Sequence, residues 1–518
     1  MSPFPPESWP PKLEPSQLAH LTTLATTYAL AHSLQYLPPH TPSSPPPPAP
    51  AAAIHAPISL FPAPIPRSVF EDAQKIQKAY STLYARVAMD RDFLDDVMGA
   101  LVDVDPFTGA LWRAWKEVRD DCVQPLQLGL FRSDYLLHQP RAEDPVQYRQ
   151  VEFNTISSSF GALSQQVAGL HRHLLASTGY FGASPLLKKE NLPPNDTVAG
   201  LVAGMVSAHE AYGVADAYVL FVVQPDERNI FDQRLLEYEL LEKHGIRVIR
   251  QTLAQLSTSA SLSPSRTLLI TSPKLSPTPI EISLVYFRAG YTPTDYASSK
   301  TYALRGLFER SKAIQCPSLA LQLAGGKKVQ EVLARPGVLE RFLSEEEGAE
   351  ALRKTWVGMW GLDADVSSIP PAVVHAVPLS ESGDEPAGTR LARERSEDLV
   401  LKPQREGGGN NIYRTSIPSF LSSLPPAERS AWIAMELIRP PRSIGSHLMR
   451  SGDEKALKAD VISELGVFSS ALFGFSEGQE RTVKSETAGW LVRTKAEGVD
   501  EGGVAAGFSV LDSVLLVD

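Results

Sequence analysis

The stretch from Ala217 to Leu253 restricts the fold of this chain more than any other. "AYVLFVVQ" is an apolar run of strand length, "FDQRLLEYELLEKHG" has a helical pattern that ends on Gly245, and "IRVIRQTL" is a second strand. A strand, a helix and a strand in this order predict a β-α-β unit, which is typical of a parallel sheet. "ISLVYFRAGY" and "SKTYALRGLFERSKAI" add a further strand and helix. We therefore predict a small α/β domain, inserted in a larger one.

The rest of the chain supplies the larger body. Helical periodicity runs from about Pro15 to Leu37 and returns in "PRSVFEDAQKIQKAYSTLYARVAMDRDFLDDVMGALVDV" and "ALWRAWKEVRDDCVQPL". The proline-rich stretch from Pro38 to Ala53 predicts a linker or surface loop. Strands at "QLGLFRSDYLL" and "YRQVEFNTIS" predict a hairpin. We divide the chain into 1–216 (with the proline-rich loop within 37–66), 217–325 for the inserted domain, and 326–518.

Composition narrows the class of protein. With 518 residues and 43% hydrophobic content, the chain can bury a large core. Its 49 basic and 59 acidic residues give a net charge of −10, which argues against a protein devoted to coating nucleic acid. Two cysteines exclude a disulfide framework. The N-terminus resembles neither a secretory signal nor a transit peptide, and no run of 18 apolar residues occurs. We expect a soluble cytoplasmic protein.

One glycine-rich segment, "LVLKPQREGGGNNIY" from Leu399 to Tyr413, combines features of a nucleotide site. Three glycines in a row cost backbone entropy, but their N–H groups can approach an anion closely. Lys402 ends an apolar run, and Glu406 is a hard oxygen ligand of the kind that Mg²⁺ prefers. The segment is not a Walker A loop, because no G-x-x-x-x-G-K-[ST] occurs. Bound Mg-nucleotide and a charged hairpin turn both remain open at this point.

A second group of polar residues lies in "FRSDY" and "VEFNTISSSFG". Glu152 and Asn154 alternate on one face of a strand, where two oxygen ligands can share a divalent cation. Arg132 lies on the predicted neighbouring strand and can bind a carboxylate bidentately, and Ser157 and Ser159 follow with hydroxyls. A polar strand end with a surface ion pair is the plainer interpretation, and by itself the better supported one.

Further segments carry weaker signals. "ERNIFDQR" follows a strand and opens a helix, which places it where ligands bind in open α/β sheets, although it equally suits a capped helix start. "VRTKAEGVDEGGVAAG" puts Arg493 and Lys495 on one strand face before a loop of small residues, which is otherwise a flexible C-terminal loop. "MELI" can present backbone groups to an adenine edge, and "SELG" places Glu464 at a strand end.

Taken together, these strings resemble the eukaryotic glutathione synthetases, a family of ATP-grasp ligases. The likeness rests on nine ordered matches, "RSDY", "NTIS-SFG", "ERNIFDQR", "VYFR-GY", "LAG-KKVQ", "VLKPQREGGGNN-Y", "ISELG-F", "LVRTKA" and "GGVAAG", within a span from "LFPAPIP" to "GGVAAGFSVLD". The resemblance implies an α/β ATP-grasp fold with glycine-rich and alanine-rich lid loops. It also implies that the protein ligates γ-glutamylcysteine to glycine through an acyl phosphate, with ATP hydrolysed to ADP. It further implies a homodimer.

The resemblance also assigns residues. Mg²⁺ would be held by Glu152, Asn154 and Glu406. The implied ATP-binding residues are Lys327, Lys402, Glu406, Gly407, Gly408, Gly409, Asn410, Asn411, Tyr413, Met435, Glu436, Leu437, Ile438, Glu464, Lys495 and Glu501. The implied substrate-binding residues are Arg132, Ser157, Ser158, Ser159, Glu227, Arg228, Asn229, Gln233, Arg288, Tyr291, Arg493, Val504 and Ala505. Arg493 and Arg132 are the implied catalytic residues, and Arg493 would stabilise charge on the acyl phosphate and the tetrahedral intermediate.

Three positions depart from the family pattern, namely Ala289, Leu437 and Glu501, and none of them removes a cation or a metal ligand. We therefore expect an active enzyme. Two alternatives stay open: a ligase that joins the dipeptide to another acceptor, such as β-alanine or serine, and a nucleotide-binding regulator without turnover. "GGVAAG" favours glycine as the acceptor, and the intact Glu152, Asn154, Glu406 and Arg493 argue against the regulator.

Overall fold

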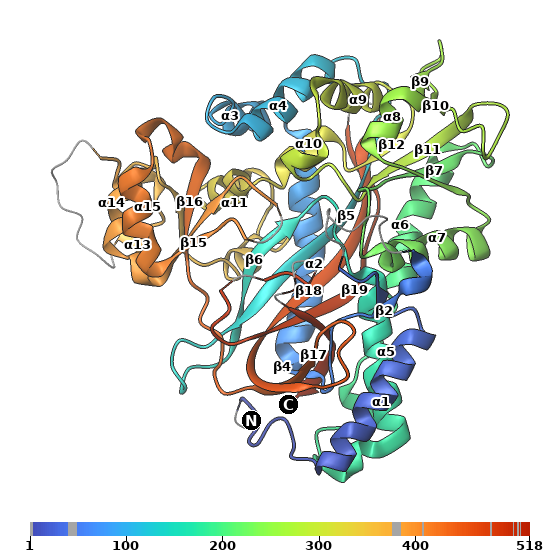
Figure 1. Cartoon of the computed structure of the whole chain (residues 1–518). Helices are drawn as coiled ribbons and strands as arrows, with labels where there is room; N and C mark the ends of the chain where they lie inside the picture. Colours follow the sequence, from blue (N-terminus) through green and yellow to red (C-terminus); the bar gives the residue numbers. More distant parts are fainter. Residues whose placement is uncertain are drawn as a thin grey trace.

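The computed structural model describes residues 4–39, 49–374, 385–406, 409–476, 479–500, 502–504, 507 and 509–518. Helices and sheets alternate along the chain, so the prediction of a mixed α/β fold is confirmed (Figure 1). The helices are α1 Pro15–Ala31, α2 Arg67–Met89, α3 Arg91–Gly99, α4 Pro106–Val118, α5 Gly161–Thr178, α6 Thr197–Tyr212, α7 Ile230–His244, α8 Leu253–Ser259, α9 Ser299–Glu309, α10 Leu319–Ala324, α11 Lys327–Ala334, α12 Ala349–Arg353, α13 Pro371–Val374, α14 Ala387–Glu394 and α15 Ile417–Ser423.

The described residues form a large sheet of 13 strands. Its main path runs β17 (Gly445–Met449), β3 (Ile58–Ser59), β20 (Val510–Asp512), β19 (Gln479–Ala496), β18 (Leu457–Ser476), β5 (Leu126–His138), β12 (Ile314–Cys316), β11 (Ile280–Phe287), β10 (Leu268–Ile270) and β9 (Ala260–Leu262). Off this path, β6 (Gln147–Asn154) pairs with β5, and β7 (Tyr218–Val222) pairs with β11 and β8 (Val248–Gln251). Two short pairs, β1 (Gln35–Tyr36) with β2 (Ile54–His55) and β21 (Val514–Val517) with β4 (Ala63–Pro66), lie outside it.

The predicted β-α-β unit is confirmed. Strands β7 and β8 pair in parallel, and α7 between them ends at Gly245, whose φ of 70° is the left-handed conformation that glycine adopts most easily. Strand β11 lies between β7 and β12 and runs parallel to both. Because β12 in turn pairs with β5 at Gln315 and Gln127, the strands of 217–325 continue the sheet of the body. The division of the chain into domains stays a prediction.

The predicted hairpin is also confirmed, with β5 and β6 antiparallel. Arg132 lies opposite Asn154, and Asp134 lies opposite Glu152. The register then shifts so that Tyr135 faces Gln150, which leaves Val151 as the extra residue of a β-bulge. On its other edge, β5 pairs with β18, so β5 lies inside the sheet, whereas β6 pairs only with β5 among the described strands and forms an edge.

Helices cover both faces of this central region. On β18, Ser469 accepts a hydrogen bond from Gln77 of α2, whereas the next residue, Ser470, lies against Gly204 of α6. Since successive side chains of a strand point to opposite faces, α2 and α6 pack on opposite sides of β18 (Figure 1). A side chain at Gly204 would come within 2.6 Å of Ser470 Cβ, so glycine permits the close approach of α6.

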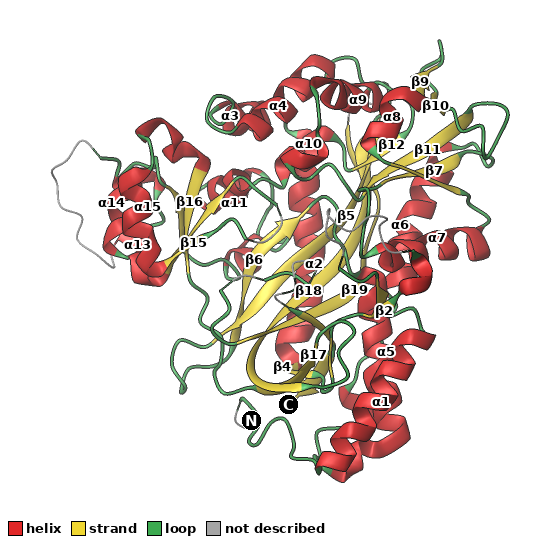
Figure 2. Cartoon of the chain, viewed as in Figure 1, coloured by secondary structure: helices red, strands yellow, loops and turns green. Residues whose placement is uncertain are grey.

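A smaller sheet stands apart from the large one. It is antiparallel, in the order β13 (Met359–Gly361), β16 (Trp432–Glu436), β14 (Leu399–Pro403) and β15 (Ile412–Tyr413). Helices α13, α14 and α15 lie on one side of it (Figure 2). It has a core of its own, which includes Trp360, Leu391, Leu401 and Ile417. This second unit carries the glycine-rich segment and presents it to the large sheet.

The first helix differs from its prediction. We expected a helix from Pro15 to Leu37, but α1 ends at Ala31, and Gln35–Tyr36 form a strand that pairs with Ile54–His55. Ser33 has a φ of 59°, which stops the helix. None of the described helices combines the length and the apolar character needed to cross a membrane.

Candidate active site

A cavity of about 1330 Å³ lies between the two sheets and collects most of the predicted site residues. Its lining includes Arg132, Glu152, Asn154, Ser157, Ser159, Tyr291, Lys327, Lys402, Glu406, Asn410, Asn411, Tyr413, Met435, Glu436, Leu437, Ile438, Glu464, Arg493, Lys495 and Val504. These residues come from segments that are hundreds of positions apart in the sequence. The fold therefore gathers the separate motifs around one space.

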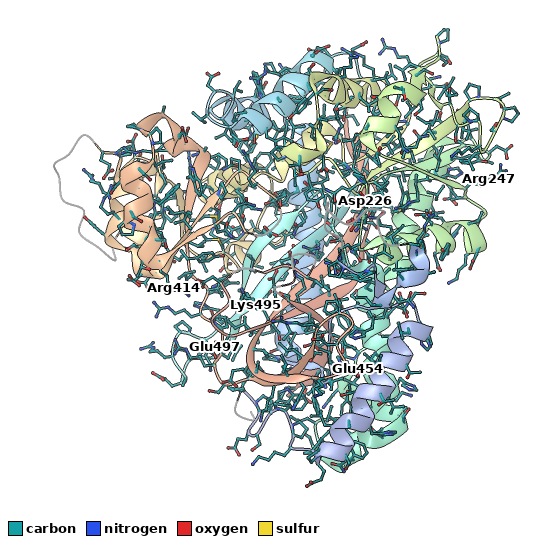
Figure 3. All side chains as sticks on the ribbon, viewed as in Figure 1. Asp226, Arg247, Arg414, Glu454, Lys495 and Glu497 are labelled. Carbon is teal, nitrogen blue, oxygen red and sulfur yellow. The ribbon has the colours of Figure 1, made fainter. Side chains whose placement is uncertain are left out.

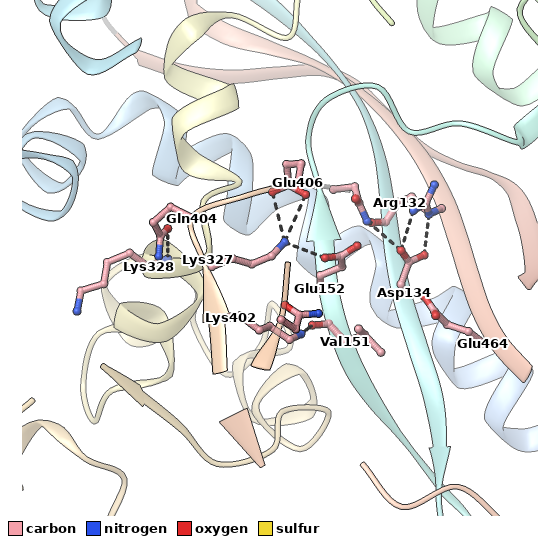
Figure 4. A network of polar contacts seen from close by, with 12 residues as sticks. Arg132, Asp134, Val151, Glu152, Lys327, Lys328, Lys402, Gln404, Glu406 and Glu464 are labelled. Carbon is pink, nitrogen blue, oxygen red and sulfur yellow. Dashed lines mark hydrogen bonds and ion pairs between the residues drawn. The ribbon is translucent and has the colours of Figure 1, made fainter. Parts of the chain in front are cut away.

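Lys327 stands at the centre of the site, where it joins the two predicted metal-binding carboxylates. Its ammonium lies 2.8 Å from Glu152 Oε2 and 3.3 Å from both carboxylate oxygens of Glu406 (Figure 4). Burial opposes its charge, but the two carboxylates outweigh burial and raise the pKa of Lys327. For Glu406, burial prevails over Lys327 and raises the pKa to about 7. One ammonium thus compensates two carboxylates only in part.

Lys402 reaches the same group of charges from the smaller sheet. Its Nζ donates to the carbonyl oxygen of Val151 at 3.0 Å. Val151 is the bulged residue of β6, and bulges of this kind often re-aim groups next to active sites. Burial lowers the pKa of Lys402 to about 8, against the attraction of Glu152. The bulge therefore ties a buried cation of one sheet to the backbone of the other.

Arg132 and Arg493 share a carboxylate that we did not predict, that of Asp134. Arg132 binds it through Nε and Nη2, at 2.6 and 2.8 Å (Figure 4). Arg493 Nη2 lies 2.9 Å from its Oδ2. Arg493 also pairs with Glu464. A signal for Asp134 was present, since "RSD" on a strand puts Arg132 and Asp134 on one face. The bidentate edge of Arg132, which we expected to face a substrate carboxylate, is taken by Asp134.

Gln404, which we also did not predict, joins the glycine-rich segment to α11. Its Oε1 accepts from the backbone N–H of Lys328 at 3.0 Å, and its Nε2 donates to the Ala431 carbonyl at 3.1 Å. It is the residue two before Glu406, while Lys328 follows Lys327. This side chain therefore sets the distance between the elements that carry Lys327 and Glu406.

At the edge of the smaller sheet, two residues that line the cavity, Glu436 and Leu437, already have hydrogen-bond partners within the protein. The carboxylate of Glu436 is occupied, because Oε2 accepts from Gly358 N at 3.0 Å and Oε1 from Arg395 Nη2 at 2.7 Å. The N–H of Leu437 donates to Asp398 O at 2.8 Å. Leu437, one of the departures from the family pattern, is thus fixed by its backbone.

A second cluster of predicted residues lies beside the cavity without lining it. It consists of Glu227, Arg228, Asn229, Gln233 and Arg288, and it surrounds Asp232. Arg288 Nη1 lies 3.0 Å from Asp232 Oδ2, and Glu227 accepts from Asn229 N at 2.8 Å. Among the described residues, the buried Arg288 Nε and Asn229 Oδ1 have no hydrogen-bond partner. Buried polar groups without partners are unusual and often mark a ligand site.

The segment after β6 connects this cluster to the cavity. Ser157 and Phe160 have φ values of 52° and 72°, in the left-handed region that residues with side chains rarely adopt. Asp232 accepts from the N–H groups of Phe160 and Ala162, both at 2.9 Å, and so caps α5 from α7. Ser157 Oγ donates to Phe287 O at 3.1 Å. Strained backbone held by such contacts is characteristic of functional segments.

The remaining predicted residues fall at the margins. Gly407, Gly408, Glu501 and Ala505 lie outside the described residues. Gly409 has a φ of 93°, which requires glycine or strain. Ser158 is buried and donates to Leu130 O at 3.3 Å. Lys495, which lines the cavity together with Glu497 and Arg414, donates to Asp500 O at 2.7 Å (Figure 3). The described part of the chain has no group of three or more His, Cys, Asp or Glu suited to a metal.

The comparison with known families decides which family the chain belongs to. A family model described as eukaryotic glutathione synthase, ATP binding domain, matches residues 15–516. The chain belongs to this family. The glutathione synthetase large chain of Schizosaccharomyces pombe is 36% identical over 98% of this chain and 99% of its own length, and the human glutathione synthetase is 38% identical over 89% and 90%. The predicted family membership, the glutathione-forming activity and the ligase class are therefore confirmed.

A solved structure agrees in fold. That of a glutathione synthetase like-effector from Globodera pallida, in apoform, has a TM-score of 0.73 and covers 98% of each chain. Its sequence identity is 23%, so this likeness concerns the architecture alone.

Proposed function

We propose that the chain joins γ-glutamylcysteine to glycine, with ATP converted to ADP and phosphate through an acyl phosphate. One observation carries the site assignment: Lys327 lies between Glu152 and Glu406, with Lys402 beside them, in a cavity lined by residues of both sheets. Cations and carboxylates that line one cavity suit a phosphoryl transfer, which depends on positioning and charge neutralisation.

The nucleotide would lie along the smaller sheet. Lys327 and Lys402 would contact its phosphates, and Asn410, Asn411, Tyr413, Glu464 and Lys495 line the same cavity. Its adenine would meet the strand end at Met435–Ile438. Because Leu437 N already donates to Asp398 O, the next N–H, that of Ile438, is the one suited to a base nitrogen. The loop of Gly407 to Gly409 and the alanine-rich loop would act as lids that exclude water from the labile acyl phosphate.

The donor set at Glu152, Asn154 and Glu406 fits Mg²⁺. Two carboxylates and an amide oxygen are hard ligands, and both carboxylates already converge on one cation, the ammonium of Lys327. Bound there, Mg²⁺ would neutralise phosphate oxygens during transfer. The residues of this protein would hold the triphosphate of ATP in line with the attacking carboxylate.

The dipeptide would occupy the end of the cavity near Ser157, Ser159 and Tyr291 and extend to the adjoining cluster. The unpartnered Arg288 Nε and Asn229 Oδ1 are a donor and an acceptor of the kind that an amino acid end would satisfy. Arg493 and Arg132 lie where charge develops. The dipeptide carboxylate would attack the γ-phosphate, and the glycine amine would then displace phosphate from the acyl phosphate, with Arg493 facing the tetrahedral oxyanion.

The same proposal includes three further properties: the architecture, the oligomeric state and the location of the protein. The two sheets whose residues line the cavity support an ATP-grasp architecture. A homodimer would be checked by light scattering of the purified chain. Cytoplasmic location would be checked by fractionation, since curated relatives from Solanum lycopersicum and Arabidopsis thaliana are described as chloroplastic.

The deciding experiment uses purified protein, Mg-ATP and γ-glutamylcysteine. Phosphate release and product mass are followed with glycine, with β-alanine, with serine and with no acceptor. We expect glycine-dependent phosphate, matched by one tripeptide per ATP, and its loss in Glu406→Ala and Arg493→Ala. Turnover only with another acceptor, or ATP binding without any turnover, would overturn the proposal.

A further inference from the structure

Asp134 is a buried carboxylate next to the cavity to which no role has been assigned. Its side chain is 0% exposed and does not line the cavity. It lies on the central strand β5, opposite Glu152 of β6 and Gly466 of β18. A buried carboxylate is costly unless it is paired and hydrogen-bonded, so its partners indicate its purpose.

Three side chains that surround the proposed reaction bind this one carboxylate. Arg132 donates from Nε to Oδ1 at 2.6 Å and from Nη2 to Oδ2 at 2.8 Å. Asn154 Nδ2 and Arg493 Nη2 both donate to Oδ2, at 3.0 and 2.9 Å. The four bonds match the acceptor capacity of a carboxylate, roughly four lone-pair sites. Asp134 therefore connects residues of β5, β6 and β19 at a single point.

The contact with Asn154 determines which end of its amide faces the cavity. Its Nδ2 has two acceptors, Asp134 Oδ2 at 3.0 Å and the Arg132 carbonyl at 3.3 Å. The amide oxygen is consequently left for the cavity, which Asn154 lines. An amide oxygen is a suitable ligand for a hard cation, whereas an amide nitrogen is not. Asp134 thus selects the useful orientation of Asn154.

The opposite strand leaves space for this arrangement. A Cβ at Gly466 would lie 2.8 Å from Asp134 Oδ1 and 3.0 Å from Arg132 Cδ. Asp134 cannot move away easily, because all its hydrogen bonds run to buried or half-buried groups. The glycine of "SELG" therefore accommodates the Arg132–Asp134 pair.

We propose that Asp134 is a positioning residue that sets Arg132, Asn154 and Arg493 in one geometry and so couples the dipeptide end of the site to its metal end. This inference rests on the proposed function for the identity of the ligands. Asp134 contacts none of them and acts only through its three partners.

The first test is Asp134→Asn, which keeps the shape but removes the charge and one acceptor. Loss of a partner that orients a metal ligand typically costs about 10–100-fold, and a misplacement of about 1 Å can cost about 10²-fold. We expect kcat to fall by about this factor, the KM for γ-glutamylcysteine and the Mg²⁺ concentration for half-maximal activity to rise about 10-fold, and the KM for ATP to change less than about threefold. A calorimetric titration of γ-glutamylcysteine should show the same loss of affinity without any turnover.

Glu331→Gln is the matched control. Glu331 is also 0% exposed and also binds two cations, Arg335 at 2.7 and 2.9 Å and Lys328 at 3.3 Å, but it lies outside the cavity. We expect it to lower the melting temperature as Asp134→Asn does, with the dipeptide KM and the Mg²⁺ dependence unchanged. The proposal is overturned if both variants change the kinetics alike, or if Asp134→Asn lowers only the melting temperature.

Gly466→Ala tests the same point with every charge retained. Its methyl group would displace Asp134 Oδ1, so we expect a rise in dipeptide KM in a folded protein. Gly99→Ala, where a Cβ meets nothing within 4 Å, is the control. Wild-type dipeptide affinity in folded Gly466→Ala contradicts the proposal. If the proposed function itself were wrong, the wild type would show no turnover with glycine. The calorimetric titrations would still compare the affinities of the variants for γ-glutamylcysteine.

Discussion

The carbonyl oxygen of Val151 accepts a hydrogen bond from Lys402 Nζ at 3.0 Å, across the space between the two sheets. Val151 is available because the bulge in β6 takes it out of the ladder between β5 and β6. The contact joins the smaller sheet to the larger one at the centre of the site. It also holds a buried lysine near Glu152, although Lys402 forms no ion pair with a carboxylate in the described part of the chain.

Lys402→Met tests the importance of this cation. Methionine keeps the apolar stem but removes the charge that we assign to a phosphate. We expect kcat/KM for ATP to fall by about 10²–10³-fold, the cost of losing one preorganised group that stabilises the transition state. Steady-state kinetics with varied ATP would measure it. Lys458→Met, at an exposed position of β18, is the control and should match the wild type. Near-normal ATP kinetics in Lys402→Met would contradict the assignment of Lys402 to a phosphate of ATP.

Gln404→Leu tests the link between α11 and the glycine-rich segment. The change leaves Lys328 N and Ala431 O without their partner, at about 1–3 kcal/mol for each buried group. We expect a lower melting temperature and a rise of about 10-fold in the KM for ATP, because Lys327 and Glu406 lose their fixed separation. Gln315→Leu is the matched control for Gln404→Leu. Gln315 also bonds two backbone groups, Phe308 O and Ala313 O, but it lies away from the cavity. An equal effect of both variants on ATP binding would contradict the link.

The sequence predicted those parts of the fold that depend on local pattern. The β7-α7-β8 unit and the β5–β6 hairpin have strong periodicity and clear ends, and both form as expected. The motif residues around Glu152, Lys402 and Arg493 were found because their side-chain chemistry is explicit. Their gathering around one cavity came from the family resemblance, since they are far apart in the chain.

Other features depended on three-dimensional context. The bulge at Val151 arises from the pairing of two strands and leaves no mark in either. Asp134 and Gln404 were overlooked because both act on other protein groups, which only the packed structure brings near. The end of α1 at Ala31 was missed because the apolar pattern continues into Gln35–Tyr36, where pairing with β2 replaces the helix.

Asp295→Ala tests how the loop after β11 is held. Asp295 Oδ2 accepts from Gly290 N and Tyr291 N, at 2.8 and 3.2 Å, and Oδ1 accepts from Gln224 Nε2 at 2.9 Å. Since Tyr291 lines the cavity, we expect the KM for γ-glutamylcysteine to rise about 10-fold, with the KM for ATP unchanged. Thr294→Ala, at an exposed position of the same loop, is the control and should leave both constants as they are. An unchanged dipeptide KM in Asp295→Ala would show that the loop does not depend on this carboxylate.

Glu309 gives a prediction about stability and pH. It is the last residue of α9, it is buried, and its Oε1 accepts from Leu319 N at 2.7 Å. Burial raises the pKa of Glu309 to about 7, against the attraction of Arg305. A carboxyl group whose pKa is raised by folding binds more protons in the folded state, so the free energy of unfolding decreases as pH rises from about 4.5 to about 7. The decrease amounts to at most about 3 kcal/mol.

Glu309→Gln should remove this loss, because glutamine resembles the protonated acid and keeps the acceptor for Leu319 N. We expect the melting temperature of the variant, relative to the wild type, to increase between pH 5 and pH 8. Glu347→Gln is the control: Arg86 holds the pKa of Glu347 at about 2, so that carboxylate stays ionised throughout this range and the difference from the wild type should be constant. A constant difference for Glu309→Gln as well would mean that Glu309 is ionised in the folded protein at pH 5, and that the Arg305 charge, rather than burial, governs it.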